Sequence, residues 1–148
     1  MRKYVFFTLF LSVLFGTVAF SQSIWGGYVS AGMGVEFTEN FGNMYLSSGF
    51  SVNKAAISLN QGIGLNIDCS VSQLTLFLRG GVSASILFAS STDANAVLLS
   101  GDSRIGARLH DFGVFVGVTK IFVFFNDTSN HIPSNGKLSP EFGVGYVW

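Results

Sequence analysis

The sequence predicts an all-β fold: a closed antiparallel up-and-down transmembrane β-barrel, of eight strands, that follows a cleaved N-terminal leader. Three observations predict it. The 148 residues are 49% hydrophobic and only 11% charged, which is too apolar for an ordinary soluble domain of this size. Beyond the leader, hydrophobic residues alternate with polar or small ones, the period of a strand whose two faces meet different surroundings. The chain also ends on such a strand, whose last residue is Trp148.

The first residues, "MRKYVFFTLFLSVLFGTVAFSQS", have the layout of a secretory signal peptide. Arg2 and Lys3 precede an apolar stretch, and the small residues Ala19 and Ser21 form a cleavage site. We therefore expect a signal peptide over residues 1–21 and one domain, the barrel, over residues 22–148. An uncleaved anchor helix is the alternative, since the apolar stretch could nearly cross a bilayer.

Charge and cysteine content exclude other classes. The formal net charge is zero and no basic run occurs, so we expect no nucleic-acid partner. Cys69 is the single cysteine, so an internal disulfide is impossible. A secreted chain without disulfides needs another way to hold its ends, and closure of a barrel supplies one.

Seven segments show the alternation: 25–37, 44–52, 57–68, 73–89, 97–109, 112–120 and 138–148. In the first, Trp25 shares the apolar face with Met33, Val35 and Phe37, opposite Gly34 and Glu36. In the last, the apolar face ends in Phe142, Val144, Tyr146 and Trp148. Lys120 breaks the phase of its segment, which predicts a bulge or a strand end there.

Seven is an odd number, whereas single-chain bacterial barrels have an even number of strands. Dividing the fourth segment by a three-residue loop at Arg79-Gly80-Gly81 makes eight and keeps the phase; one long strand over 73–89 is the alternative. The short turns 53–54, 79–81 and 110–111 then lie at one end. The longer loops 38–42, 90–94 and 126–137 lie at the other, as in outer-membrane barrels.

Charged residues fall on the polar face of the strands. A charge that faces mid-bilayer lipid costs about 2 to 4 kcal/mol for Arg or Lys, so these side chains should point inward. We expect a polar network in the lumen formed by Arg79, Asp102, Arg104, Arg108 and Glu141, joined by Tyr28, Asn60, Asn66, Gln73 and Thr75. Side chains just fill an eight-stranded barrel, so we expect no open pore.

These features together resemble a family, the small eight-stranded outer-membrane barrels of diderm (Gram-negative) bacteria, of the OmpX, OmpW and OmpA-transmembrane types. The most specific part is the terminal strand. In that family, alternating hydrophobic residues that end on an aromatic resemble the signal read by the barrel assembly machinery, here Phe142, Val144, Tyr146 and Trp148. The resemblance implies a porin-like architecture in the cell outer membrane, with membrane lipid and the assembly machinery as partners.

The sequence contains no catalytic constellation and no cofactor or metal motif, so we expect no enzyme. His110 and His131 fall in different predicted loops. The leading expectation is a barrel with a structural role, or one whose loops contact host surface components. The OmpW type suggests an alternative, a conduit for small hydrophobic molecules, with Phe77, Leu87 and Phe115 as an inward apolar constriction. Less favoured are a lipid-modifying barrel enzyme, with His131 beside Asp127, Ser129 or Ser134, and a soluble lipocalin-like binder with its apolar face inside.

Overall fold

The computed structural model describes residues 21–29, 32–53, 56–89, 95–126, 129–133 and 138–148, together with Thr8, Ser12 and Gly16. Among these, the side chains of residues 28–29, 89, 95, 124–126 and 129–133 are not described. The expected signal peptide, 1–21, therefore lies almost wholly outside the described residues. No helix in the described ranges is long and apolar enough to span a bilayer.

The described residues form nine strands: β1 (Ser23–Val29), β2 (Gly32–Phe41), β3 (Met44–Val52), β4 (Ala56–Val71), β5 (Leu74–Ala89), β6 (Asn95–Leu109), β7 (Phe112–Asn126), β8 (Ser129–Pro133) and β9 (Leu138–Val147). Each strand from β1 to β7 pairs antiparallel with the next, and β9 pairs with both β7 and β1, which closes the sheet.

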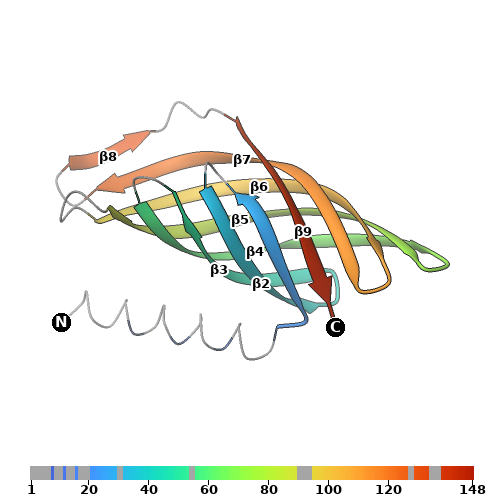
Figure 1. The fold of residues 1–148 in the computed structure, drawn as a ribbon. Helices are drawn as coiled ribbons and strands as arrows, with labels where there is room; N and C mark the ends of the chain where they lie inside the picture. The colour runs from blue at the N-terminus through green and yellow to red at the C-terminus, as the bar shows by residue number, and fades with distance from the viewer. Residues whose placement is uncertain are drawn as a thin grey trace.

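The short strand β8 adds no position to the ring. It pairs with the last residues of β7, and β9 pairs with residues 112–120 of the same strand. The two strands therefore follow one another along one side of β7, as Figure 1 shows. The ring has eight strand positions, which confirms the predicted closed antiparallel up-and-down β-barrel of eight strands.

The eighth strand does not arise where we expected it. β5 runs without interruption through Arg79, Gly80 and Gly81, and all three pair with β4 on one side and β6 on the other. The predicted loop at 79–81 is wrong, because partners on both sides keep this segment extended. The first alternating segment is divided instead: β1 and β2 form a hairpin in which Val29 pairs with Gly32.

Because of this hairpin, several turns lie at the opposite end of the barrel from the one predicted. The end that holds the chain terminus, here called the lower end, carries the two-residue turns 42–43, 72–73 and 110–111. Gly42, Ser72 and His110 have the positive φ that such turns require. The predicted 110–111 turn is confirmed, whereas the expected loop 38–42 is mostly strand.

The upper end carries the connection from β3 to β4, where Val52 pairs with Ile57 rather than with Ala55 as expected for a 53–54 turn. The connections from β5 to β6 and around β8 also lie there. The sequence interpretation placed the 38–42 and 53–54 connections at the wrong ends of the barrel. It divided the chain within β5 rather than between β1 and β2, and this error reverses the direction of every strand between the two points.

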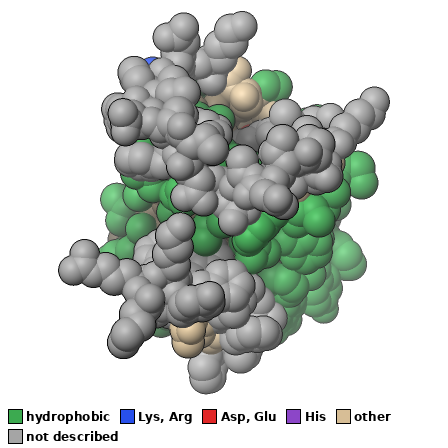
Figure 2. Space-filling model, turned by 90° about the vertical axis from the view of Figure 1, so that its left-hand side faces the viewer, with side chains coloured by type: hydrophobic (Ala, Val, Ile, Leu, Met, Phe, Trp, Pro, Cys, Tyr) green, Lys and Arg blue, Asp and Glu red, His purple; other side chains and the backbone are tan. Residues whose placement is uncertain are grey.

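The outer wall is apolar and exposed. Large exposed hydrophobic side chains project from seven of the eight ring strands, β2 to β7 and β9; they include Met33, Phe50, Ile67, Leu78, Ile105, Val116 and Phe142. In Figure 2, hydrophobic side chains gather over the described part of the wall. By contrast, the buried hydrophobic side chains are few: Trp25, Tyr45, Phe77, Ala96 and Phe115. The distribution is the reverse of a water-soluble barrel.

Two charged side chains on the described strands face outward, one near the end of β2 and one in the middle of β7. Glu39 is close to the lower turn 42–43, and Lys120 is exposed opposite Leu138 at the beginning of β9. Lys120 keeps the alternation, since Thr119 beside it is buried. The irregularity that we expected at Lys120 occurs two residues later, because Leu99 and Ser100 pair with Val123 and Ile121 and leave Phe122 as an extra residue.

Candidate functional site: the filled lumen

Three aromatic side chains fill the lower half of the lumen. Trp25 of β1 contacts Phe77 of β5 and Phe115 of β7, edge to face, at ring-centroid distances of 5.4 and 5.7 Å. The indole Nε1 donates a hydrogen bond to Ser23 Oγ, 3.1 Å away. The one-strand interpretation of residues 25–37 placed Trp25 on the outer apolar face, and this is wrong. Because Val29 pairs with Gly32, the alternation changes phase between β1 and β2, and Trp25 shares a face with Glu36, its partner across the hairpin.

Glycines on neighbouring strands make room for these rings. A Cβ at Gly106 would overlap the Phe77 ring, and one at Gly145 would overlap the indole of Trp25. A Cβ at Gly143 would lie 2.5 Å from Phe115 Cε1. The aromatic cluster can therefore lie flat against the inner wall only because β6 and β9 carry no side chain at these points.

Arg79 covers the aromatic cluster. Its guanidinium carbon lies 5.3 to 5.5 Å from the ring centroids of Trp25, Tyr45 and Phe77, within cation–π range. Its Nε also donates a hydrogen bond to Asn66 Oδ1 at 3.1 Å. This arginine is thus held by rings and an amide.

Arg104, the cross-strand partner of Arg79 on β6, is the centre of a charge cluster. Its Nη1 donates to both carboxylate oxygens of Glu36, at 2.8 and 3.0 Å, and its Nε donates to Glu141 Oε2 at 2.8 Å. A third carboxylate, Asp102, lies 3.6 Å from Nε. Thr119 donates its hydroxyl proton to the second oxygen of Glu141. These side chains come from β2, β6, β7 and β9, so the cluster ties opposite walls across the lumen.

The other predicted network members are distributed unequally. Arg79, Asp102, Arg104 and Glu141 all lie in the lumen, but Arg108 is half-buried near the lower end and makes no ion pair with a described residue. Asn66 and Thr75 are buried, Asn60 lines the upper lumen, and Gln73 is exposed in the lower turn. The side chain of Tyr28 is not among those described.

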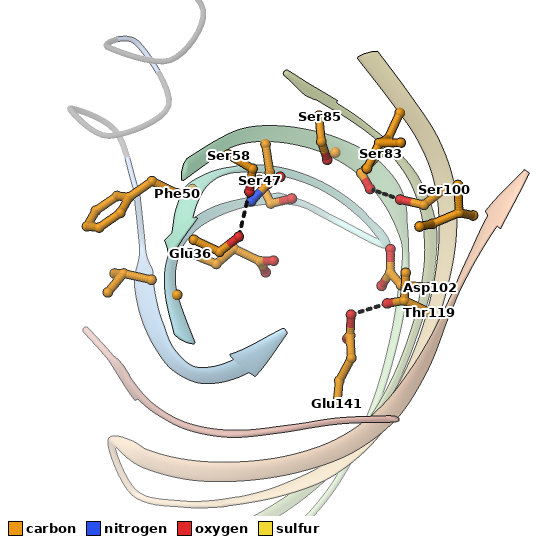
Figure 3. Close-up of a pocket in the computed structure, with 18 of the residues that line it drawn as sticks. Glu36, Ser47, Phe50, Ser58, Ser83, Ser85, Ser100, Asp102, Thr119 and Glu141 are labelled. Carbon is orange, nitrogen blue, oxygen red and sulfur yellow. Dashed lines mark hydrogen bonds between the residues drawn. The ribbon is translucent and has the colours of Figure 1, made fainter. Parts of the chain in front are cut away.

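A hollow of about 100 Å³, here called the upper chamber, lies above the charge cluster. Figure 3 shows the hydroxyl groups that line it and the carboxylates of Glu36, Asp102 and Glu141 that point into it. Its walls carry six serines: Ser47, Ser51, Ser58, Ser83, Ser85 and Ser100. Leu87, Leu98 and Ile121 form an apolar arc farther up β5, β6 and β7.

The terminal strand presents the residues of the expected assembly signal on the outer wall. Phe142, Val144, Tyr146 and Trp148 are all exposed, and the intervening Glu141 is buried in the lumen. Tyr146 contacts Phe112 at 5.1 Å and stacks on Trp148 at 6.1 Å, which makes an aromatic group at the lower edge of the wall. Trp148 is held by a backbone hydrogen bond from its N–H to the carbonyl of Gln22.

Sequence reasoning missed two central lumen residues. Glu36 and Tyr45 both fall on the polar face of their alternating segments, but neither was assigned to the charge network. Glu36 is 68 residues from Arg104, and only closure of the ring brings them together. A signal for both existed in principle, since each alternates with outward hydrophobic residues, as a lumen residue must.

The side chains of the residues predicted for a lipid-modifying enzyme are not among those described. Ser129 and His131 lie in β8, where side chains are not described, and Asp127 and Ser134 lie outside the described residues. His110 occupies the lower turn, and its backbone φ is 54°. Within the described ranges, no group of three or more His, Cys, Asp or Glu side chains could hold a metal ion. No family model, no curated protein and no solved structure matches this chain.

Proposed function

We propose that this chain is a small, non-enzymatic integral protein of the outer membrane, with a plugged lumen and a structural or surface-interaction role. The observation that carries the proposal is the reversed distribution of side chains. Hydrophobic residues cover the outer wall, while the charges of Arg104, Glu36 and Glu141 are enclosed. A lipid bilayer is the environment in which this arrangement is stable, because the strands pair around a closed ring and the apolar outer wall needs no water.

Plugging follows from the contents of the lower lumen. The ring cluster of Trp25, Phe77 and Phe115 and the ion pairs of Arg104 occupy successive levels between the upper chamber and the lower end. An ion would have to displace both. A conduit for hydrophobic molecules is disfavoured for a related reason, since cargo would enter a chamber of serines and carboxylates. A lipocalin-like binder would need an apolar lumen and a charged exterior.

The terminal strand supports insertion through the assembly machinery. Its outward residues form an unbroken apolar face that ends on Trp148. An amphipathic indole ring is at home at a membrane interface. Its position at the lower edge, beside the two-residue turns, corresponds to the periplasmic side of a barrel whose longer connections face outward.

The test is heat-modifiability of the protein in isolated outer membranes. Boiled and unboiled samples should migrate differently on an SDS gel, because a closed barrel resists unfolding by the detergent. Removal of Trp148 should reduce the amount of folded barrel in the membrane, and Trp148→Phe, which keeps an aromatic terminus, should restore it. Recovery of the protein in the aqueous periplasmic fraction would overturn the proposal.

Planar bilayer recording separates the plugged barrel from the alternatives. We expect no discrete conductance steps from the purified protein. Uptake of a hydrophobic dye by liposomes that contain it should match empty liposomes. Steady open-channel steps would refute a plugged lumen, and dye uptake would favour the conduit.

A further inference from the structure

The upper chamber has an unbalanced charge at its base. Three carboxylates, Glu36, Asp102 and Glu141, surround the single guanidinium of Arg104. Arg79, the cross-strand neighbour of Arg104, brings the count to three carboxylates against two guanidinium groups, but it makes no ion pair with a described carboxylate and lies against the aromatic rings. Arg108 lies nearer the lower end of β6. A buried carboxylate requires a compensating partner. The base of the chamber is therefore a place where a further positive charge is stabilised.

Asp102 is the carboxylate with unused capacity. Glu36 and Glu141 both engage Arg104 through short bonds, and the second oxygen of Glu141 accepts from Thr119. Asp102 has only long contacts, 3.6 Å to Arg104 Nε and 3.5 Å to the Tyr45 hydroxyl, and both end on Oδ2. Among the described residues, its Oδ1 accepts no hydrogen bond. A carboxylate can accept about four, so Asp102 is free to bind a donor from the chamber.

Ser85 supplies an independent indication of a ligand. Its side chain points into the chamber and is only 8% exposed, yet it makes no hydrogen bond with a described residue. The neighbouring Ser83 and Ser100 hydroxyls, in contrast, bond to each other at 2.9 Å, as do those of Ser51 and Ser58 at 2.5 Å. The Ser85 hydroxyl is therefore available to a donor or acceptor that enters the chamber.

The side chains that line the chamber change from charged and polar at its base to apolar toward the upper end. Along β6 the inward residues rise from Asp102 through Ser100 to Leu98, and along β5 from Ser83 through Ser85 to Leu87. A ligand that matches this order carries a positive charge with N–H donors at its inner end and a short aliphatic part toward the opening. A bare metal ion fits less well, since the described acidic residues form no metal-binding group.

We propose that the upper chamber binds a primary ammonium group carried on a short aliphatic stem. Asp102 is its counter-ion, Ser85 accepts a second N–H bond, and the stem lies against Leu87 and Leu98. An ammonium has three donors and no acceptor, which suits a site of oxygen acceptors. The hollow of about 100 Å³, which Leu87 and Leu98 also line, suits a small occupant.

Calorimetric titration of the full barrel in detergent micelles tests the proposal. Butylammonium chloride should bind saturably, and 1-butanol and tetramethylammonium chloride should bind at least about tenfold more weakly, at constant ionic strength. The first comparison compound lacks the charge and the second lacks the N–H donors, and a charge-assisted hydrogen bond is the stronger kind. Equal binding of tetramethylammonium, equal competition by potassium chloride, or no saturable binding of butylammonium would overturn the proposal.

Variants locate the site. Asp102→Asn should weaken binding about tenfold or more, and Ser85→Ala a few-fold. The matched controls are Asp111→Asn in the lower turn and Ser103→Ala on the outer wall, which should leave binding unchanged. Each variant is first checked for a heat-modifiable band. If Asp102→Asn does not fold, the titration of Ser85→Ala tests the site in its place. Unchanged butylammonium binding by either variant in its folded form refutes the site.

This inference is separate from the proposed cellular role. Binding is measured in micelles and depends on the closed barrel alone, whereas fractionation tests the membrane location. A barrel that binds butylammonium but is absent from the outer membrane would refute only the role, and a membrane barrel that binds nothing would refute only the site.

Discussion

The two halves of the lumen differ in how the space inside the ring is occupied. The lower half is filled by flat rings, with Trp25, Phe77 and Phe115 packed against glycines of the facing strands. The upper half is lined by serines and stays hollow. Arg104 separates them, since its guanidinium carbon lies 5.0 Å from the Phe115 ring centroid while its donors bind the carboxylates of the chamber. An inner wall of small residues can thus accommodate either a solid plug or a cavity, depending on where the aromatics are placed.

Loss of Arg104, which contacts both halves of the lumen, should lower the free energy of unfolding more than any other substitution considered below. Arg104→Ala removes the ion-pair partner of Glu36, Asp102 and Glu141, and removal of one partner from a buried ion pair destabilises by about 3 to 5 kcal/mol. Urea titration of the refolded barrel measures it. Arg108→Ala, on the same strand and face, should change stability by less than about 1 kcal/mol. Equal losses would mean that the cluster contributes no more than an isolated charge.

The plug of the lower half is tested by Trp25→Ala. Deletion of a buried aromatic side chain should cost about 3 to 5 kcal/mol, because the surrounding rings and glycines cannot close the space. Trp148→Ala is the control, since its side chain is 59% exposed on the outer wall, and an effect of less than about 1 kcal/mol is expected in refolded protein. A small loss for Trp25→Ala would show that the rings occupy the lumen without supporting it.

A substitution at glycine tests how tightly the rings are packed. Gly106→Ala should destabilise by about 1 to 3 kcal/mol, because the added methyl group would overlap the Phe77 ring. Gly80→Ala is the matched change, since the nearest heavy atom to its Cβ would be 3.8 Å away, and it should be close to neutral. The same urea titration compares them. Equal tolerance of both methyl groups would contradict a solid lower half.

The smallest change in stability is expected for a substitution in the wall of the upper chamber. Ser58→Ala removes one hydroxyl of the Ser51–Ser58 pair, and the net contribution of such a bond is about 0.5 to 1.5 kcal/mol. We expect the lower part of that range, because water in the chamber can replace the lost hydroxyl. A thermal unfolding scan is sufficient. A loss as large as that of Gly106→Ala would mean that the chamber wall is as tightly packed as the plug.

Much of the fold was predictable because it depends on local alternation. Period two placed the strands, put Arg79, Asp102, Arg104 and Glu141 on the polar face, and indicated that β9 must close a barrel. Loop lengths were less predictable, since three of the four residues from Thr38 to Phe41 are polar, as in a loop, yet all four continue β2. The composition of a four-residue stretch cannot reveal that its backbone is paired on both sides.

By itself, the sequence determined that this chain has one apolar and one polar face along nearly all its length, since side-chain alternation is a property of each strand alone. Only the tertiary structure decided where the chain turns. The reversal between Val29 and Gly32 inverts the phase, so that Trp25 enters the lumen while Met33 stays outside. Closure of β9 onto β1 and β7 then brought Glu36, Arg104 and Glu141 into contact, because residues distant in sequence become neighbours only when every register around the ring is set.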